Sequence, residues 1–389
     1  MIQPTPIEQM LETAILRKKL SIGLPKPASG SDRRFPLTPE GAGMLVNKGF
    51  VVKMQAGGAA DIHYDDEKYS RAGVNIVQHP EAMQCDIVIC LSPLDSIDAR
   101  LMRRGAMLFT MSDSVTWNPM TLKALLLNGI LTVALDLVSD CRANHPFADI
   151  LAEISGRSAI AVASALLTDS VHGKGILLGG IAGIVPCEVT ILGSGIDACA
   201  AASSAIGLGA IVRMFDNDVY RLRAALRELG PGVSGSALHP RVLQNALRSA
   251  DVVVATPLNP PLSISGSVAA DMKIGVIVFD LFNQHPTFPS LKQIDLGHGI
   301  PSDQSLDGNR ICYTNPANAV PRTAAMAMSN ALHTLFNEIF TCDGVNAALM
   351  LNEGLQAAAL TFMGKAVNPT VASLLGVRHV DIKLLLQFT

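Results

Sequence analysis

Residues 186–218 read PCEVTILGSGIDACAAASSAIGLGAIVRMFDND, and the order of features in this stretch decides the fold. Residues 189–192 form a short apolar and β-branched run, which is typical of a buried parallel strand. The run breaks at a glycine-rich turn, and an alanine-rich segment that predicts a helix follows. A second apolar run at residues 210–215 then ends on Asp216. Strand, turn, helix and strand in this order predict a βαβ unit of a doubly wound α/β fold.

The glycine turn has the spacing of a dinucleotide-binding fingerprint. Gly193 permits the tight turn, and Gly195, which follows Ser194, lets the backbone approach a pyrophosphate at the helix N-terminus. Ala198 replaces the third glycine and still permits close packing of the helix on the strand. Asp216 lies 21 residues after Gly195, where a carboxylate accepts hydrogen bonds from an adenosine ribose and repels a 2′-phosphate. The pattern predicts NAD rather than NADP as the cofactor. The alternative is a doubly wound domain that keeps these glycines for packing alone.

The composition indicates a well-buried protein of two domains. The 389 residues exceed what one core usually organises, and 49% of them are hydrophobic while only 16% are charged. The net charge of −3 argues against a nucleic-acid partner. Pro, Gly or charge interrupts every apolar run, and the N-terminus lacks the order of a signal peptide, so we expect no membrane and a cytoplasmic location. Seven cysteines without metal-ligand spacing predict no metal site.

The first 140 residues predict a βα-alternating domain of their own. A strand at residues 20–24 precedes a loop that carries Arg33 and Arg34, and Thr38 and Pro39 then cap and start a helix. Ligands of open α/β sheets bind at the carboxyl ends of the strands. An arginine fork at such an end suits a substrate carboxylate. A solvated loop arginine is the alternative.

Several segments in the right order resemble the alanine dehydrogenase and proton-translocating transhydrogenase α-subunit family, and alanine dehydrogenase more closely. They span nearly the whole chain and are GLPKP, RRFPLTPEGAGMLV, AEISGRSA, KGILLGGIAGIVPCEVTILGSG, GLGAIVRMFDN and NPANAVPRTAAMAMSNAL. The resemblance implies two Rossmann-like domains. It implies that residues 148–317 bind NAD, and that residues 1–147 and 318–389 form a discontinuous substrate domain. It also implies a homo-oligomer, a hexamer or a dimer, whose substrate is a small amino acid or 2-oxo acid.

When the resemblance is carried over residue by residue, this chain has the family's residues at the binding positions. Arg34 matches the family's carboxylate-binding arginine in its R-x-x-L-T-P motif. Asn315 with Pro316 matches the turn near the nicotinamide, and the fingerprint glycines, Ala198 and Asp216 match the NAD site. The resemblance therefore implies NAD binding and a clamp for a substrate carboxylate.

The positions that carry the chemistry in the family do not match. Leu91 stands where the resemblance expects the substrate lysine, Asp113 where it expects a histidine, and Asn283 where it expects an aspartate. Asp113 and Asn283 are thus degenerate catalytic positions, and Leu91 is a degenerate substrate-binding position. Asp280 and His285 are candidate replacements.

Two functions are compatible with binding positions that match the family and catalytic positions that do not. The first is an alanine dehydrogenase-like, NAD-dependent oxidoreductase of a small amino or oxo acid, with alanine itself turned over very poorly. The second is a catalytically inactive NAD-binding paralogue with a regulatory or assembly role. We favour the enzyme because the resemblance covers the full length. NADH formation against a panel of amino acids, together with NAD titration, separates the two.

Overall fold

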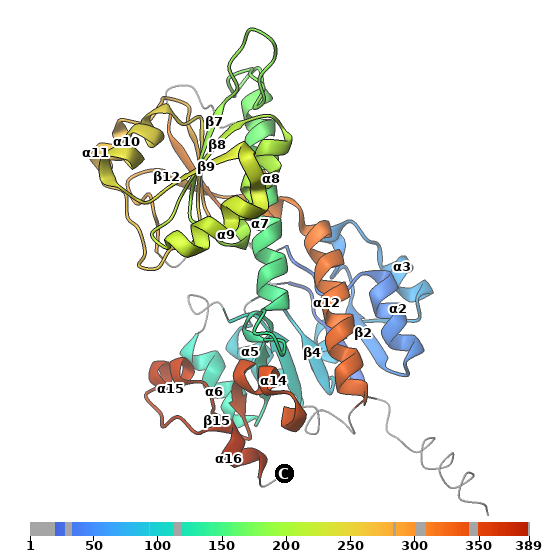
Figure 1. The fold of residues 1–389 in the computed structure, drawn as a ribbon. Coiled ribbons are helices and arrows are strands. Elements are labelled where there is room, and N and C mark those ends of the chain that lie inside the picture. The colour runs from blue at the N-terminus through green and yellow to red at the C-terminus, as the bar shows by residue number, and fades with distance from the viewer. Residues whose placement is uncertain are drawn as a thin grey trace, which may run out of the picture. The chain divides into compact units, whose positions relative to one another are not determined.

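The computed structural model describes residues 20–27, 33–92, 94–112, 118–282, 285–300, 309–341 and 349–387. They form two compact α/β units, each built on a largely parallel sheet with helices packed on it (Figure 1). Unit 1 comprises residues 1–27, 35–135 and 329–389, and unit 2 comprises residues 28–34 and 136–328. The predicted fold class, two Rossmann-like units of which the first is discontinuous, is confirmed.

Unit 1 contains an eight-stranded sheet in the order β15-β14-β6-β5-β4-β1-β2-β3. Its strands are β1 (Ser21–Leu24), β2 (Val51–Gln55), β3 (Asn75–Val77), β4 (Ile87–Ile89), β5 (Met107–Thr110), β6 (Leu131–Ala134), β14 (Ala359–Phe362) and β15 (Lys365–Ala366). The first six strands are parallel, and the C-terminal segment returns to add β14 and β15 in antiparallel pairing. The helices are α2 (Pro39–Asn47), α3 (Asp66–Arg71), α4 (His79–Met83), α5 (Ser96–Leu101), α6 (Pro119–Leu127), α14 (Glu353–Ala358), α15 (Pro369–Leu375) and α16 (Ile382–Leu386).

Helix α2 begins where its sequence predicts. The Thr38 hydroxyl accepts a hydrogen bond from the Gly41 N–H at 3.2 Å, and Pro39 occupies the first turn, where its missing N–H costs nothing. Helix α12 (Pro321–Thr341) reaches this cap through Ser329 and through His333, whose Nε2 lies 2.9 Å from the Gly41 carbonyl oxygen. A long helix late in the chain thus fixes the start of an early one.

Unit 2 contains a seven-stranded, entirely parallel sheet in the order β12-β13-β11-β10-β7-β8-β9. Its strands are β7 (Glu188–Leu192), β8 (Ile211–Phe215), β9 (Val233–Ser236), β10 (Val252–Ala255), β11 (Ile277–Asp280), β12 (Lys292–Asp295) and β13 (Ile311–Thr314). Its helices are α7 (Pro146–Thr168), α8 (Ile196–Gly207), α9 (Val219–Leu229), α10 (Pro240–Ser249) and α11 (Gly266–Ala270). The βαβ unit predicted from residues 186–218 is β7-α8-β8.

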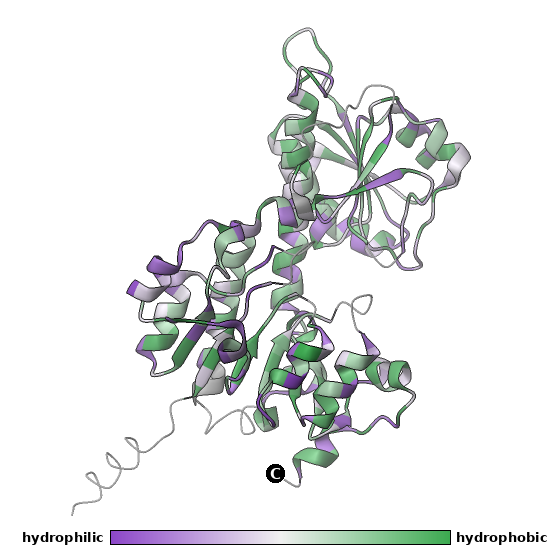
Figure 2. Ribbon diagram, turned by 180° about the vertical axis from the view of Figure 1, so that it is seen from behind, coloured by the Kyte–Doolittle hydropathy of each residue, from purple (hydrophilic) through white to green (hydrophobic). Residues whose placement is uncertain are grey.

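Helix α7 is the long apolar helix of unit 2, and it packs directly on α8. Among the described helices it alone has the length and composition to cross a membrane, although 44% of that window is buried in the protein. Its apolar residues join those of α8 and the sheet in one core, and Figure 2 shows the apolar colouring along both. Gly156 makes the contact close, because a Cβ there would lie 2.0 Å from the Asp197 carbonyl oxygen. α7 is thus a core helix.

Candidate functional site

The glycine turn lies at the carboxyl end of β7, where the strand order of unit 2 reverses. β8 and β9 extend the sheet on one side of β7, and β10 and β11 extend it on the other. Gly193 has a φ of 114°, and its N–H donates to the Phe215 carbonyl oxygen at 2.7 Å. A Cβ at this position would lie 2.0 Å from the Thr256 Oγ1. Both the backbone and the space therefore require glycine at the switch point, where ligands of such sheets bind.

Helix α8 starts directly after this turn. Gly195 is its N-cap and provides no side chain, and of the first-turn N–H groups that of Ala198 already donates to the Asp197 Oδ1 at 2.8 Å. Ala198 is fully buried in the core of unit 2, as the small third residue of the fingerprint requires. The turn and helix thus have the form of an anion-binding N-terminus.

Asp216 joins the end of β8 to the glycine turn. Its Oδ2 accepts from the Ser194 hydroxyl at 2.6 Å and from Arg221 Nη2 at 2.9 Å, and its Oδ1 accepts from the Asp218 N–H at 2.8 Å. Only 2% of its side chain is exposed, against 43% of Arg221. Burial opposes ionisation of Asp216, but the hydrogen bonds from Ser194, Asp218 and Arg221 prevail and lower its pKa. Asp216 is therefore an ionised carboxylate whose two oxygens already accept hydrogen bonds.

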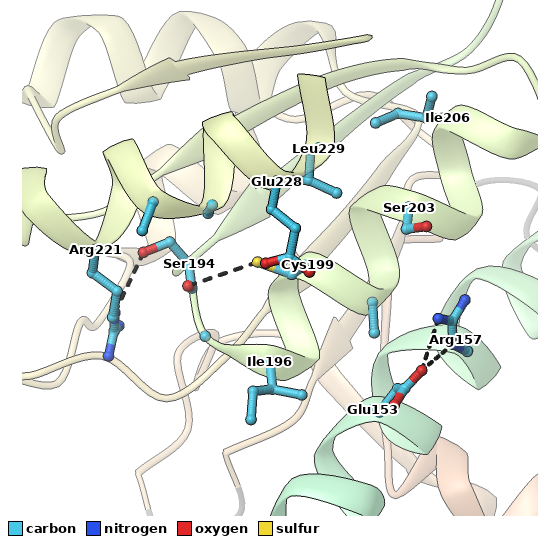
Figure 3. A pocket seen from close by; sticks show the side chains of 14 residues that line it. Glu153, Arg157, Ser194, Ile196, Cys199, Ser203, Ile206, Arg221, Glu228 and Leu229 are labelled. Carbon is cyan, nitrogen blue, oxygen red and sulfur yellow. Dashed lines mark hydrogen bonds and ion pairs between the residues drawn. The ribbon is translucent and has the colours of Figure 1, made fainter. Parts of the chain in front are cut away.

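A cavity of about 560 Å³ opens beside the turn, between α7, α8 and α9 (Figure 3). Arg221 borders it at one end, close to Ser194, and the ion pair of Glu153 and Arg157 borders it at the other, with a shortest distance of 2.7 Å. Cys199 lines the middle, and burial raises the pKa of its thiol to about 11. The thiol is thus a packing group and no nucleophile near neutral pH.

Asn315 marks the carboxyl end of β13. Its φ of 54° places it in the left-handed region, from which the short helix η5 (Pro316–Ala319) begins. Its Nδ2 donates to the Asp295 Oδ1 at 3.1 Å, which ties the turn to the end of β12. This strand, β12, is absent from the sequence-based expectation.

The predicted substrate and catalytic positions are distributed differently. Leu91 follows β4 in unit 1 and is only 3% exposed, whereas Arg34 is half-buried and groups with unit 2. Asp113 and Asn283 lie outside the described residues. The structure therefore brings together Gly193, Ser194, Gly195, Ala198 and Asp216, and the grouping of the other candidates stays a prediction.

The candidate replacements for the missing chemistry have different surroundings. Asp280 is 2% exposed and accepts from the Thr287 N–H at 2.6 Å and the Phe282 N–H at 3.2 Å. Burial raises its pKa against these hydrogen bonds. It therefore anchors the turn after β11. His285 is exposed, and its ring lies 5.5 Å from the ring of Phe282.

Two charged residues of this site escaped the sequence analysis. Arg221 pairs with Asp216 from five positions along the chain, and Asp197 lies in the first turn of α8. The signal for Asp197 was present, because an acid in the first turn of the fingerprint helix would repel a phosphate bound there. The signal for Arg221 was weak, because nothing in the sequence fixes which way an arginine of α9 points.

Comparison with known proteins matches almost the whole chain to one family. The family description "Alanine dehydrogenase/PNT, N-terminal domain" matches residues 23–155, and "Alanine dehydrogenase/PNT, C-terminal domain" matches residues 159–369. The alanine dehydrogenase of Mycolicibacterium smegmatis is 28% identical over 368 residues, 92% of this chain and 98% of that protein. The alanine dehydrogenase of Bacillus subtilis is 28% identical over 372 residues, 94% of this chain and 97% of that protein.

Solved structures show the same relationship. An L-alanine dehydrogenase superposes with a TM-score of 0.80 at 25% identity, covering 92% of this chain and 99% of that one. A transhydrogenase from Sinorhizobium meliloti shares the fold, with a TM-score of 0.71 at 19% identity and a coverage of 90% and 99%. With both domains matched in order, the chain belongs to the alanine dehydrogenase/PNT family.

Proposed function

We propose that this protein is a cytoplasmic, NAD-dependent oxidoreductase that acts on a small amino acid or 2-oxo acid. In this proposal unit 2, centred on residues 148–317, binds NAD, and unit 1, with residues 1–147 and 318–389, forms the substrate domain. The observation that carries it is the glycine turn at the sheet's switch point, with Asp216 hydrogen-bonded to Ser194 beside it. NADH formation against a panel of amino acids tests it, with NADH consumption against the matching 2-oxo acids in the presence of ammonium.

The residues of the turn fit a dinucleotide. Gly193 has no room for a side chain, and at Gly195 a Cβ would meet only the carboxylate of Asp197, so the backbone of the turn can approach a pyrophosphate where that side chain moves aside. NAD, when bound, would accept the hydride from the substrate Cα. Asn315 would lie near the nicotinamide, and the Arg34 guanidinium would hold the substrate carboxylate.

The pairing of Asp216 with Arg221 leads to a prediction for cofactor choice. The Asp216→Ser variant loses the carboxylate that repels a 2′-phosphate, and it also releases Arg221 to bind that phosphate. Hydrogen bonds to charged groups contribute ~1.5–3 kcal/mol, so the affinity for NADP relative to NAD should rise by about tenfold or more. Calorimetric titration with both cofactors measures the ratio. The double variant Asp216→Ser with Arg221→Ala should lose most of the gain, and a gain that persists there would contradict the role of Arg221.

One observation favours a second candidate, a catalytically inactive NAD-binding paralogue with a regulatory or assembly role. Leu91, at the family's lysine position, is almost fully buried and apolar. An active site that used other catalytic groups in place of the family's lysine would be expected to carry a polar side chain at this position. NAD binding without turnover of any member of the substrate panel would select this candidate.

We further propose that the chain forms a homo-oligomer, a dimer or a hexamer, through the loop between α7 and β7. This loop projects from unit 2 (Figure 1) and exposes several large apolar side chains. They are Val171 at 76%, Leu177 at 62%, Ile181 at 59%, Ile184 at 63% and Val185 at 78% exposure. An apolar surface of this kind usually marks an interface. Sedimentation should show an oligomer that Ile184→Asp with Val185→Asp dissociates, and an unchanged oligomer would exclude this loop.

A further inference from the structure

We propose that the carboxylate of Asp197 occupies the pyrophosphate position of the fingerprint, so that the protein's own anion closes the empty NAD site. NAD then binds only when this carboxylate moves away or takes up a proton. The inference rests on the proposed function, because it concerns the same site and adds a regulation to it.

The geometry of the turn carries the proposal. Asp197 is the second residue of α8, and its Oδ1 accepts from the Ala198 N–H at 2.8 Å. The same Oδ1 lies 2.9 Å from the position that a Cβ of Gly195 would take. In a fingerprint this is the side on which glycine leaves room for the pyrophosphate. A carboxylate oxygen of the chain itself therefore lies beside this space and accepts from a helix N–H that a phosphate oxygen would use.

No ion pair neutralises the charge of Asp197. Its side chain is only 9% exposed, and among the described residues no lysine or arginine forms an ion pair with it. Arg221 of α9 attracts it from a distance, but the hydrogen bonds of Arg221 go to Asp216 and Ser194. A pyrophosphate brought to the same helix N-terminus would meet a negative charge that Arg221 offsets only from a distance. Repulsion between the two should weaken NAD binding.

Other titratable groups near Asp197 do not change this balance. The carboxylate of Glu153 on α7 pairs with Arg157, and Asp216 pairs with Arg221. Glu228 on α9 and the un-ionised Cys199 thiol on α8 line the neighbouring cavity. Apart from the long-range attraction of Arg221, none of these groups supplies a positive charge to Asp197.

Proton uptake provides the opening step. Burial raises the pKa of Asp197 to about 6, while the Ala198 N–H and Arg221 act in the opposite direction. The carboxyl group is charged above this value and neutral below it. Because NAD favours the neutral form, the affinity for NAD should rise as the pH falls from 8 through about 6.

Calorimetric titration of the full chain with NAD tests the proposal at about pH 8 and about pH 5. Asp197→Asn keeps an acceptor for the Ala198 N–H and removes the charge. A like charge at short range shifts binding by about tenfold or more, so the variant should bind NAD about tenfold more tightly than the wild type at the higher pH. At the lower pH the two should agree. Asp271→Asn removes one exposed negative charge from the same unit, at the end of α11 and outside the cavity, and should change the affinity by less than about twofold.

The outcomes separate this inference from the proposed function. If the wild type and Asp197→Asn bind NAD equally at about pH 8, the inference is wrong and the NAD site stands. If neither binds NAD at about 5 mM, the NAD site itself is wrong and the inference falls with it. The double variant Gly195→Val with Asp197→Asn should lose the tighter NAD binding expected of Asp197→Asn alone. If the double variant still binds NAD more tightly than the wild type, the effect of Asp197→Asn arises outside the turn. If the Asp197→Asn variant does not fold, Asp197→Ala provides the same test. The pH dependence of NAD binding by the wild type tests the proposal without any variant.

Discussion

The wild-type protein is expected to oxidise L-alanine with NAD at a rate orders of magnitude below the ~10 per second of an ordinary enzyme. Oxidative deamination needs a base for the proton of the amino or carbinolamine group and donors that steady the developing carbonyl. Leu91 cannot donate a hydrogen bond, and Asn283 cannot act as a base near neutral pH. If Asp113 stands at the family's histidine position, as the resemblance implies, it would add a negative charge beside a substrate carboxylate. Because each acid or base contributes roughly 10²- to 10⁴-fold, losing three such groups removes almost all turnover.

Restoring the three groups should restore the reaction. The triple variant Leu91→Lys, Asp113→His and Asn283→Asp is expected to raise kcat/KM for alanine by about 10²-fold or more, measured as steady-state NADH formation. Leu91→Met in place of Leu91→Lys is the matched control, because Leu91 is 3% exposed and both replacements are long, unbranched side chains. The control should show no gain. Wild-type turnover near ~10 per second would contradict the prediction and mean that the reacting groups lie elsewhere.

Gly156→Ala is expected to destabilise unit 2 by about 3 kcal/mol and to abolish NAD binding. The added Cβ would lie 2.0 Å from the Asp197 carbonyl oxygen and 2.9 Å from the Ala201 nitrogen. Both are backbone atoms of α8, so α7 and α8 must separate at the turn that forms the NAD site. The better helix propensity of alanine returns only about 1 kcal/mol. Urea denaturation followed by circular dichroism measures the loss of stability.

Gly207→Ala is the matched control for this pair of helices. Gly207 is the last residue of α8, and a Cβ there would contact nothing within 4 Å. The substitution should be neutral or stabilise the protein by up to about 1 kcal/mol. If Gly156→Ala changed the free energy of unfolding as little as Gly207→Ala, the close crossing of α7 and α8 would be wrong.

The parts of the structure that follow from local chemistry could be predicted from the sequence. The β7-α8-β8 unit follows from its apolar periods and its glycines, and the start of α2 follows from Thr38 and Pro39. In each case the residues that determine the geometry are neighbours in the chain.

The details that decide the chemistry depend on residues far apart in the chain. The sequence placed Asp216 at the end of β8 but could not show that Arg221 and Ser194 already bind it. The AEISGRSA segment was recognisable, but the reason for its Gly156 is the backbone of α8, about 40 residues later. Asp197 was visible in the fingerprint, while its approach to the space above Gly195 depends on the turn geometry. The sequence gives the identity of these residues, but it does not give the direction of their side chains or the way in which the helices cross.

The most direct test of the account is a calorimetric titration of the wild-type chain with NAD at about pH 5, below the pKa of about 6 to which burial raises the Asp197 carboxyl. The account predicts saturable binding of NAD with weaker binding of NADP, and loss of both in Gly195→Val, which fills the space of the pyrophosphate while leaving the protein folded. No binding of either nucleotide by the wild type at about 5 mM would contradict it. The same would follow if the folded Gly195→Val variant bound NAD as tightly as the wild type.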